Sequence, residues 1–408
     1  MLTDSQKMIV KQTVPILQAH GETLTRHFYA RMFRVNPEVQ AYFNPAHQRS
    51  GGQQRALAGA VLAYAQHIDD PAVLSDAVEL IAQKHASLSI KPEHYPIVGD
   101  NLLASIREVL GEAATDEVIN AWAAAYRVLA DIFITREAQI YRDQQTQYGW
   151  QGFKPFLVDR REQSSDNITS LYLKPTDGKP LAAHKPGQYI SIRVALKGGE
   201  TVMRNYSLSN PPGSNYYRIS VKRESDAEGN APDGVFSNYL HDHLRVGDRV
   251  ELSPPCGEFT LDRPDDPVNP LVFIAGGVGI TPLISMLHEA LDQSDGSRPI
   301  VFIQAALNSA VQAFADELDA LRKAYSNLRV HVRFSAPGDA DRMANQHDSI
   351  GFVDDDLLDE MVTSPDADYY FCGPTPMLTH IHALLRRRNV PEDHLHYEFF
   401  GPNTTLAA

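Results

Sequence analysis

A glycine-rich turn between an apolar run and a predicted helix is the segment that indicates chemistry most clearly. Residues 271–283 read LVFIAGGVGITPL, so the apolar run ends in Gly276-Gly277-Val278-Gly279. Glycine lets the backbone approach a ligand closely, and a helix N-terminus offers unpaired N–H groups and a partial positive charge to a phosphate. We expect Thr281 to cap this helix and Pro282 to be its first residue. The segment predicts a phosphate-binding turn, although a tight turn without a ligand would have the same pattern.

Three further segments carry groups that suit an aromatic, phosphorylated ligand. Arg204-Asn205-Tyr206-Ser207-Leu208 falls on a predicted strand. There an arginine can hold a diphosphate, a tyrosine ring can stack, and a serine hydroxyl can bond a ring nitrogen. Alone, these five residues are better explained as an ordinary half-buried strand. Cys372-Gly373-Pro374 follows another predicted strand, and the run YEFFGP occupies residues 397–402.

His85 is a candidate metal ligand in the first third of the chain. It shares a predicted helix face with Ile81 and Leu88. The sequence contains 16 histidines, and a histidine on an apolar face is more often structural than a ligand. His67 and His94 are rival ligands on spacing alone.

Charge and cysteine content exclude several classes of partner. The chain of 408 residues has a net charge of −14 and no long run of Lys and Arg, which argues against nucleic acid and anionic membranes. Its two cysteines, Cys256 and Cys372, cannot build a disulfide framework. The apolar stretch 271–284 is interrupted and shorter than the roughly 20 residues of a membrane span. The N-terminal residues lack a secretory pattern, so we expect a soluble, cytoplasmic protein without a membrane span.

The predicted elements that position these residues form three domains, the first two joined by a linker. Residues 1–146 predict helices throughout, residues 147–152 a polar linker, residues 153–265 an antiparallel β-barrel, and residues 266–408 an α/β domain with a parallel sheet. The expected barrel strands are Phe153–Val158, Ile168–Lys174, Tyr189–Val194, Arg204–Leu208, Tyr217–Lys222 and Arg249–Leu252. The expected parallel strands are Leu271–Ala275, Pro299–Leu307, Leu328–Phe334 and Asp368–Cys372, with a helix over Val311–Tyr325 and another that follows the last strand and runs through Arg388.

The ordered motifs after residue 153 resemble the ferredoxin–NADP reductase superfamily. The resemblance implies an FAD-binding barrel followed by a domain that binds NADH or NADPH. The residues it assigns to FAD are Tyr189, Arg204, Asn205, Tyr206, Ser207, Gly234 and Ser237. Those it assigns to the nicotinamide nucleotide are Gly277, Val278, Gly279, Ile280, Thr281, Pro282, Cys372, Gly373 and Pro374. It places Phe400 beside the flavin ring, within the cofactor-binding segment Glu398, Phe399, Phe400, Gly401 and Pro402.

The N-terminal third resembles the globin part of the flavohaemoglobins. The motifs that carry the resemblance are Phe28-Tyr29, Asn36-Pro37-Glu38, Tyr42-Phe43-Asn44, Gln53 with Leu57, Lys84-His85, residues 91–95 and Arg136-Glu137-Ala138. It implies a b-type haem whose iron is bound by His85, with Tyr95 and Glu137 bonding the other ring nitrogen. A carboxylate in that position makes the ligand more basic and favours oxygen activation. Tyr29 and Gln53 would line the distal side of the haem, Phe43 and Leu57 would pack beside it, and Lys84 would tune its potential or be solvated.

The two resemblances together imply a nitric oxide dioxygenase that detoxifies nitric oxide. Dioxygen and nitric oxide would react at the haem to give nitrate, and NAD(P)H would re-reduce the iron through FAD. Two alternatives stay open, namely a gas-binding or gas-sensing globin with a haem reductase, and a reductase of peroxide or lipid hydroperoxide. The protein would be a monomer that binds O2 and NO, with possible room for a lipid in the distal pocket. After residue 304 the chain reads Ala305-Ala306-Leu307-Asn308 where relatives commonly carry an arginine. We therefore favour NADH over NADPH, unless Arg333 or Arg342 substitutes for that arginine.

Overall fold

The computed structural model describes residues 2–196, 199–225, 234–261, 269–294 and 296–401. The chain divides into two compact units, one made chiefly of the residues up to Phe153 and the other chiefly of those from Lys154 onward. Each unit is described by itself.

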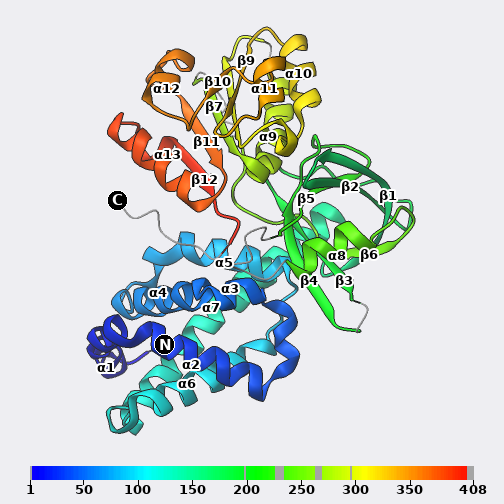
Figure 1. Cartoon of the computed structure of the whole chain (residues 1–408). Helices are drawn as coiled ribbons and strands as arrows, with labels where there is room; N and C mark the ends of the chain where they lie inside the picture. The colour runs from blue at the N-terminus through cyan, green and yellow to red at the C-terminus, as the bar shows by residue number, and fades with distance from the viewer. Residues whose placement is uncertain (1, 197–198, 226–233, 262–268, 295, 402–408) are drawn as a thin grey trace. The chain divides into compact units, whose positions relative to one another are not determined.

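The first unit is helical, which confirms the predicted all-α part (Figure 1). Its helices are α1 (Asp4–Gln12), α2 (Val14–Val35), α3 (Pro45–Arg49), α4 (Gly52–Gln66), α5 (Ser75–Ser87), α6 (His94–Leu110) and α7 (Asp116–Tyr148). Phe28 and Met32 lie one turn apart on α2 and are buried with Trp122 of α7 in one apolar core. Burying a side chain of this size contributes about 1.5–3 kcal/mol, so the apolar face of α2 holds the helices together.

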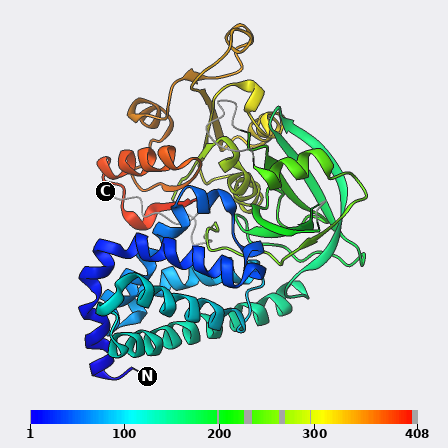
Figure 2. The same ribbon diagram turned by 60° about the horizontal axis from the view of Figure 1, so that its bottom comes forward.

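Helix α7 begins at a side-chain cap, in which Thr115 Oγ1 accepts from the N–H of Val118. It ends at Gly149, whose left-handed backbone (φ 82°) terminates the helix. It therefore runs through Tyr148, two residues into the stretch we predicted as linker (Figure 2). Among the described residues it is the one helix long and apolar enough to cross a bilayer by length and composition. Because Ala121, Trp122 and Ala125 of α7 belong to the helical core, we assign it to the fold of this unit.

The second unit begins with a six-stranded sheet. Its strands are β1 (Lys154–Ser165), β2 (Ile168–Pro175), β3 (Tyr189–Ala195), β4 (Thr201–Ser207), β5 (Tyr217–Lys222) and β6 (Arg249–Leu252), in the order β4-β3-β6-β1-β2-β5. A bridge between Leu208, directly after β4, and Ile219 of β5 joins the two edge strands. This contact closes the sheet into the predicted antiparallel barrel. The sequence did not predict α8 (Val235–His243), which follows β5 in the chain.

A parallel sheet follows, also as predicted. Its strands are β7 (Leu271–Gly276), β8 (Ile300–Ala306), β9 (Leu328–Phe334), β10 (Ser349–Ile350), β11 (Asp368–Cys372) and β12 (Leu395–Glu398), in the order β10-β9-β8-β7-β11-β12. The helices are α9 (Ile280–Gln293), α10 (Ala315–Ala324), α11 (Asp339–Ala344), α12 (Asp355–Met361) and α13 (Thr375–Arg387). The chain reverses its direction of winding between β7 and β11, and such a switch point is where open α/β sheets bind their ligands.

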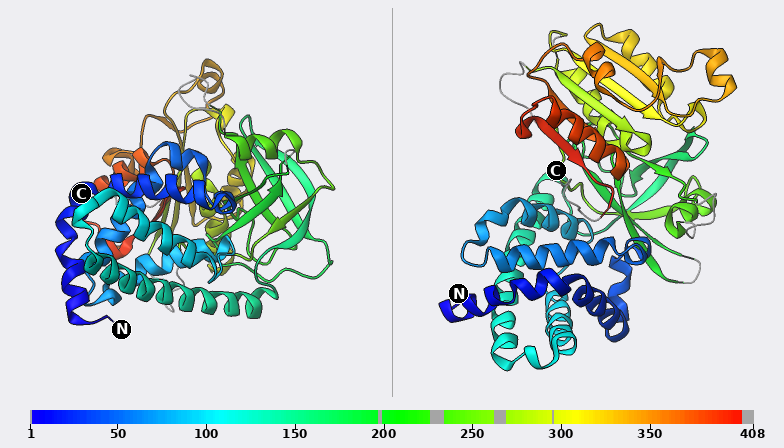
Figure 3. Two further views of the ribbon diagram at one scale, coloured as in Figure 1. Left: turned by 90° about the horizontal axis from the view of Figure 1, so that it is seen from below. Right: turned by 60° about the vertical axis from the view of Figure 1, so that its left-hand side comes forward.

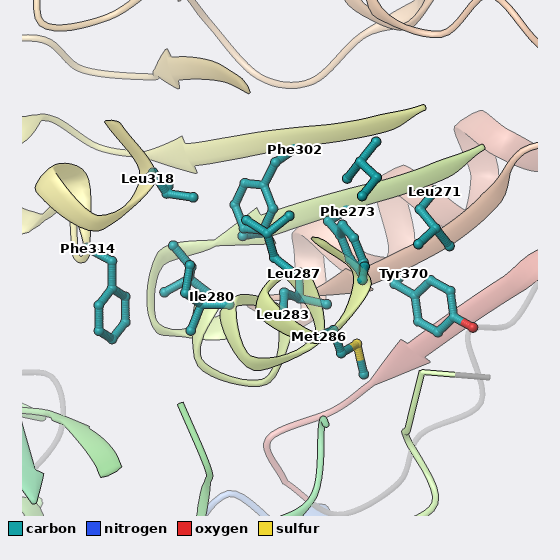
Figure 4. Close-up of a cluster of buried hydrophobic side chains, with 14 of the residues drawn as sticks. Leu271, Phe273, Ile280, Leu283, Met286, Leu287, Phe302, Phe314, Leu318 and Tyr370 are labelled. Atoms are coloured by element: carbon teal, nitrogen blue, oxygen red, sulfur yellow. The ribbon is translucent and has the colours of Figure 1, made fainter. Parts of the chain in front are cut away.

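Alternation along β7 and β8 divides the core of this sheet into two faces. Phe273 and Phe302 pack on one face with residues of α9 and α10, and Figure 4 shows this cluster. Ile274 and Ile303 pack on the other face with residues of α12 and α13. Figure 3 shows helices on both faces of the sheet. A strand buried on both faces reads as a continuous apolar run, which is why the sequence predicted β7 so clearly.

One helix was predicted too long. We expected helix from Val311 to Tyr325, but α10 begins at Ala315 and a short 3-10 turn covers Ser309–Val311. Phe314 has a left-handed backbone (φ 60°), which no helix can include. The amphipathic pattern of residues 311–325 therefore included residues before Phe314, where the left-handed backbone prevents a continuous helix.

Candidate functional site

His85 lies near the end of α5 with one ring nitrogen bound to two other residues. Its Nδ1 is 2.7 Å from Glu137 Oε1 and 3.2 Å from the Tyr95 hydroxyl. Tyr95 donates to the same oxygen of Glu137 at 2.5 Å. The Glu137 side chain is 2% exposed, whereas that of His85 is 33% exposed. The structure therefore brings together three predicted residues from α5, α6 and α7.

The chemistry of this cluster leaves the other nitrogen of His85 available. A carboxylate accepts only, so Nδ1 donates its proton to Glu137, and Nε2 is the ring nitrogen left to bind a metal. No hydrogen bond within the described residues uses Nε2. Burial, followed by the bond to Glu137, raises the pKa of Tyr95 well above its ordinary value. Tyr95 therefore stays protonated and acts as a donor to the carboxylate.

The two rival histidines have different surroundings. His67 is the exposed C-terminal cap of α4. His94 accepts from the Lys91 N–H at its Nδ1, 3.1 Å away, and its ring lies 5.0 Å from that of Tyr42. Among the described residues, neither His67 nor His94 hydrogen-bonds a carboxylate through its ring, whereas His85 does.

A second group of predicted residues gathers around Tyr29 on α2. Tyr29 is 6% exposed, and its ring centroid is 5.6 Å from that of Phe43. Gln53, in the first turn of α4, lies near Tyr29 and acts to lower the pKa of its hydroxyl. Leu57 lies one turn further along α4, and both Leu57 and Phe43 are half-buried. Lys84, which precedes His85 on α5, is also half-buried.

Sequence reasoning missed two glutamines beside this group. Gln48 of α3 bonds Gln53, and Gln54 of α4 bonds Gln48. Both are uncharged residues next to a turn, with no spacing that distinguishes them from a polar surface. Only the fold shows that they are hydrogen-bonded to Gln53 in this order.

The residues assigned to FAD lie on β3, β4 and the start of α8. Tyr206 of β4 stacks on Phe236 in the first turn of α8, with ring centroids 6.3 Å apart. No side chain caps α8 at Gly234, so the N–H groups of its first turn can bind an anion. Tyr189 and Ser207 are buried, and Arg204 is half-buried. The arginine, the tyrosine and the helix N-terminus are thus carried by neighbouring segments, which fits a diphosphate joined to a ring system.

Two residues of the same set already bond within the protein. Asn205 accepts from Ser191 Oγ at 2.5 Å. Ser237 Oγ donates to the Gly234 carbonyl and accepts from the Glu224 N–H, each at 3.2 Å. These bonds hold the backbone around Gly234, and contact of either residue with FAD stays a prediction.

The glycine turn and the Cys372 motif meet at the switch point of the parallel sheet. A side chain at Gly279 would lie 2.2 Å from the Cys372 carbonyl oxygen and 2.6 Å from the Gly373 nitrogen, so only glycine permits this approach. Gly277 is exposed and Val278 half-buried, whereas Ile280 and Pro282 are buried. The exposed part of the turn, together with Pro374, can therefore face a nucleotide.

The predicted start of this helix was wrong. Gly279, and not Thr281, is the capping residue, and α9 begins at Ile280. Thr281 Oγ1 instead donates to the Val278 carbonyl at 2.9 Å. Pro282 is the third helical residue, where its missing N–H costs nothing because the first four N–H groups have no partner in the helix. The glycine turn folds into 3-10 helix (Gly277–Gly279) and so starts the helix earlier.

The C-terminal motif lies next to Cys372. Glu398 of β12 pairs in register with Cys372 of β11, and burial, with the nearby Glu398, raises the pKa of the Cys372 thiol. Phe399 is buried, its ring 5.9 Å from that of Tyr397, while Phe400 is exposed. Gly401 is half-buried, and Pro402 lies outside the described residues.

The second unit also contains a partly buried ion cluster that the sequence did not predict. Arg218 of β5 donates to both carboxylate oxygens of Glu317 on α10, at 2.8 and 3.1 Å. His288 of α9 is 2.6 Å from the same carboxylate. Despite burial, bonds from His288 and Arg218 lower the pKa of Glu317 to about 2. The cluster ties the barrel to the helices beside the glycine turn, and its members come from distant parts of the sequence.

Three family profiles match this chain. The profile described as Globin matches residues 26–133. The profiles described as Oxidoreductase FAD-binding domain and Oxidoreductase NAD-binding domain match residues 155–261 and 273–383.

Relatives also match this chain over their full or nearly full length. The chain is 51% identical to the flavohemoprotein of Rhodopirellula baltica over 100% of both chains. It is 47% identical to that of Halalkalibacterium halodurans, over 100% of this chain and 98% of the relative.

Solved structures agree with these sequence matches. The flavohemoglobin of Malassezia yamatoensis, determined with bound FAD and heme, aligns with a TM-score of 0.83 at 26% identity, over 98% of this chain and 100% of that one. The FAD/NAD-binding domain of a Vibrio cholerae nitric oxide dioxygenase aligns with a TM-score of 0.54 at 30% identity, over 60% of this chain and 97% of that one. The matches confirm the predicted cofactors, which are haem, FAD and a nicotinamide nucleotide.

Proposed function

The chain belongs to the flavohaemoprotein family, and from this premise we propose that it is a nitric oxide dioxygenase. The family and its globin, FAD-binding and NAD-binding parts support the activity of an NAD(P)H oxidoreductase that reduces haem. To this we add nitric oxide and dioxygen as substrates and nitrate as product. The observation that carries it is the 2.7 Å bond between His85 Nδ1 and the buried carboxylate of Glu137, because this contact favours oxygen activation over oxygen carriage.

Haem, when bound, would supply the iron at which dioxygen and nitric oxide combine, and FAD would divide the two electrons of NAD(P)H into single electrons for it. His85 would hold the iron through Nε2. Glu137 would accept the Nδ1 proton and so increase the electron density on the ring. Tyr95 would hold the Glu137 carboxylate in this orientation through its own hydrogen bond.

Tyr29 would donate a hydrogen bond to a gas molecule bound beside it. Burial raises the pKa of Tyr29 well above its ordinary value, even though the nearby Gln53 side chain acts in the opposite direction. The phenol therefore keeps its proton at physiological pH. The apolar side chains of Phe43 and Leu57 would exclude water and admit only small molecules.

Replacing Glu137 by glutamine should slow nitrate formation about 10- to 100-fold, the usual cost of removing a group that orients a metal ligand. The amide has the same shape and can still accept from Nδ1, so haem should stay bound while the negative charge is lost. Steady-state nitrate formation, together with the iron–histidine stretching band in the Raman spectrum, measures both effects.

Glu79→Gln is the matched control for this change. Glu79 lies on the same helix as His85 but pairs with Arg136, so the variant removes a nearby charge without changing Nδ1. An unchanged rate and an unchanged stretching band in Glu137→Gln would refute the proposed role of Glu137.

The proposed reaction itself is tested by adding nitric oxide to the purified protein with NADH and air. Nitric oxide should disappear at a rate proportional to enzyme, and NADH oxidation should accelerate while it lasts. NADH oxidation that nitric oxide leaves unchanged would contradict the proposal and favour a globin whose reductase only keeps its iron reduced.

A second candidate function is reduction of peroxides, including lipid hydroperoxides. The same carboxylate behind His85 favours it, because electron density on iron promotes cleavage of an O–O bond. Tyr29 would then face a hydroperoxide in place of a gas. Faster NADH oxidation with an alkyl hydroperoxide than with nitric oxide would establish this function.

We expect NADH to be preferred over NADPH by about 10- to 100-fold in kcat/KM, since a charge-assisted hydrogen bond contributes about 1.5–3 kcal/mol. Residues 305–311, which form the end of β8 and the segment after it, contain no cation, and Leu307 is exposed there. Arg333 is already bound to both carboxylate oxygens of Asp354, at 2.9 and 2.6 Å. Hydrogen bonds from Ser309 and Gly338 lower the pKa of Asp341, so a negative charge lies where a 2′-phosphate would be repelled.

The matched change is Leu307→Arg, which should raise kcat/KM for NADPH and leave that for NADH nearly constant. Equal use of the two nucleotides by the unaltered protein would show that Arg333 or Arg342 serves the 2′-phosphate after all.

A further inference from the structure

We propose that Glu317 is a positioning residue for the reduction of FAD by NADH, because it holds the domain of the parallel sheet (β7–β12) against the barrel (β1–β6). In that step a hydride leaves C4 of the nicotinamide for N5 of the flavin, so NADH is oxidised to NAD+ and FAD gains one proton and two electrons. Glu317 would touch neither cofactor and would act through Arg218. The proposal rests on the reductase part of the proposed function and does not involve nitric oxide.

Arg218 of β5 holds the carboxylate of Glu317 through two bonds. Its Nη1 and Nη2 atoms donate to the two carboxylate oxygens at 2.8 and 3.1 Å, and its side chain is 7% exposed. Its guanidinium carbon also lies 4.7 Å from the centre of the Phe314 ring, directly before α10. Paired bonds between an arginine and a carboxylate fix direction as well as distance. Arg218 therefore contacts the start of α10 at two points.

The same arginine is bound to the segment that follows β4, the strand that carries residues assigned to FAD. Its Nη2 donates to the Ser209 carbonyl, and its Nε donates to the Ser209 hydroxyl at 3.1 Å. The backbone N–H of Arg218 donates to Asn210 Oδ1 at 2.8 Å. Because β4 ends at Ser207, a shift of α10 would pass through Arg218 to the backbone next to that strand end.

On its other side, Glu317 is linked to the helix that follows the glycine turn. His288 of α9 is 2.6 Å from Glu317 Oε1. Ser285, one turn earlier on α9, donates to the Asn210 carbonyl at 2.8 Å. Helix α9 begins directly after Gly279, so both contacts hold the helix whose start we assign to the nucleotide. Two links thus join α9 to the segment after β4, one direct and one through Glu317.

Hydride transfer is sensitive to a junction of this kind. The donor and acceptor atoms must meet in one orientation, and a misplacement of about 1 Å by a change far from the chemistry can slow such a step about 100-fold. Replacing Glu317 by glutamine would leave the guanidinium of Arg218 in the junction without its carboxylate partner, which is strongly unfavourable. The junction should then open to admit water, and α9 would no longer be held at one distance from β4.

The test mixes protein loaded with FAD and haem with excess NADH, without oxygen or nitric oxide, and follows the loss of NADH in the first turnover. We expect Glu317→Gln to lower the limiting rate constant about 10- to 100-fold. The NADH concentration that gives half of this rate, and the FAD bound per protein, should stay near their native values, because Glu317 lies in neither cofactor-binding segment. An unchanged limiting rate would overturn the proposal, whether or not FAD or NADH binding weakened.

Glu392→Gln is the matched control. Glu392 is likewise bound by one arginine and one histidine, Arg386 at 2.7 Å and His382 at 3.2 Å. Both partners belong to α13, in the same domain as Glu392, so this variant changes a similar ion cluster away from the junction. It should oxidise NADH at the native rate. An equal slowing in Glu392→Gln and Glu317→Gln would overturn the proposal.

A second measurement reads the geometry of the junction without turnover. Spin labels are attached at Lys179→Cys, in the barrel, and at Ala383→Cys, on α13, both at exposed positions. The native Cys256 and Cys372 are 0% exposed and should not react. Pulsed electron paramagnetic resonance should give one narrow distance with Glu317 in place and a broader or second distance in Glu317→Gln. A native distance distribution in a variant with slowed NADH oxidation would overturn the proposal.

If Glu317→Gln does not retain FAD, Glu317→Asp takes its place. Aspartate keeps the charge but is one methylene shorter, so it cannot reach both Arg218 and His288 unless α10 moves. The first turnover should be slower than in the native protein, and a native rate would overturn the proposal. These measurements use neither nitric oxide nor oxygen, so they can fail while nitrate formation stands, and the reverse.

Discussion

Replacing His85 by alanine should remove the Soret band of protein-bound haem or shift it strongly, and should abolish nitrate formation. The reason is that Nε2 of His85 is the atom we assign to the iron, with Nδ1 committed to Glu137 and Tyr95. FAD absorption should be unchanged, because the residues assigned to FAD lie between residues 189 and 237, outside the helical part. Added imidazole should restore part of the Soret band by occupying the space left by the ring.

His67→Ala and His94→Ala are the matched controls for this experiment. Each removes an imidazole from the same helical unit, and neither ring hydrogen-bonds a carboxylate among the described residues. Both variants should keep the native spectrum. A native spectrum in His85→Ala and a lost band in one of the controls would transfer the iron ligand to that histidine.

Replacing Tyr29 by phenylalanine should speed the dissociation of oxygen by about one to two orders of magnitude, since a hydrogen bond to a partly charged group contributes about 1.5–3 kcal/mol. The ring packing against Phe28 and Phe43 would be retained, so the loss is confined to one O–H group. Flash photolysis or stopped-flow mixing of the oxygenated protein measures the off-rate.

Tyr64→Phe is a suitable comparison. Tyr64 is also buried, but its hydroxyl donates to the Ala125 carbonyl at 2.9 Å, so its loss should lower stability without changing the off-rate. An off-rate in Tyr29→Phe equal to that of the unaltered protein would remove Tyr29 from the gas-binding site.

The sequence predicted the strands of the second unit well because their patterns are local. β5, β6, β9 and β11 begin and end at the predicted residues. β10 and β12 were missed, since two or four residues of mixed polarity carry no period. The length of β1 was underestimated for a related reason. Its last residues are polar and pair with β2 through their backbone, which side-chain hydropathy does not indicate.

Some residues of the candidate site could likewise be predicted from local sequence, and others could not. The glycine turn could be predicted from the residues themselves, because glycine is the residue that lets the backbone make a close approach. At position 279 it allows the backbone to approach Cys372. The grouping of His85 with Tyr95 and Glu137 needed a family resemblance, since spacing alone left three histidines open. The hydrogen bonds that join Gln53, Gln48 and Gln54 could not have been predicted either way, because they depend on how the fold brings α3 next to α4.

The central claim is that electrons from NAD(P)H support oxidation of nitric oxide to nitrate at haem. Each turnover would use one electron, and NADH carries two, so two nitric oxide and two dioxygen should yield two nitrate for each NADH. The most direct test is the ratio of nitrate formed to NADH consumed under limiting nitric oxide in air. The proposal predicts a ratio of two to one. NADH consumption without nitrate, or with hydrogen peroxide or nitrous oxide as the main product, would contradict it.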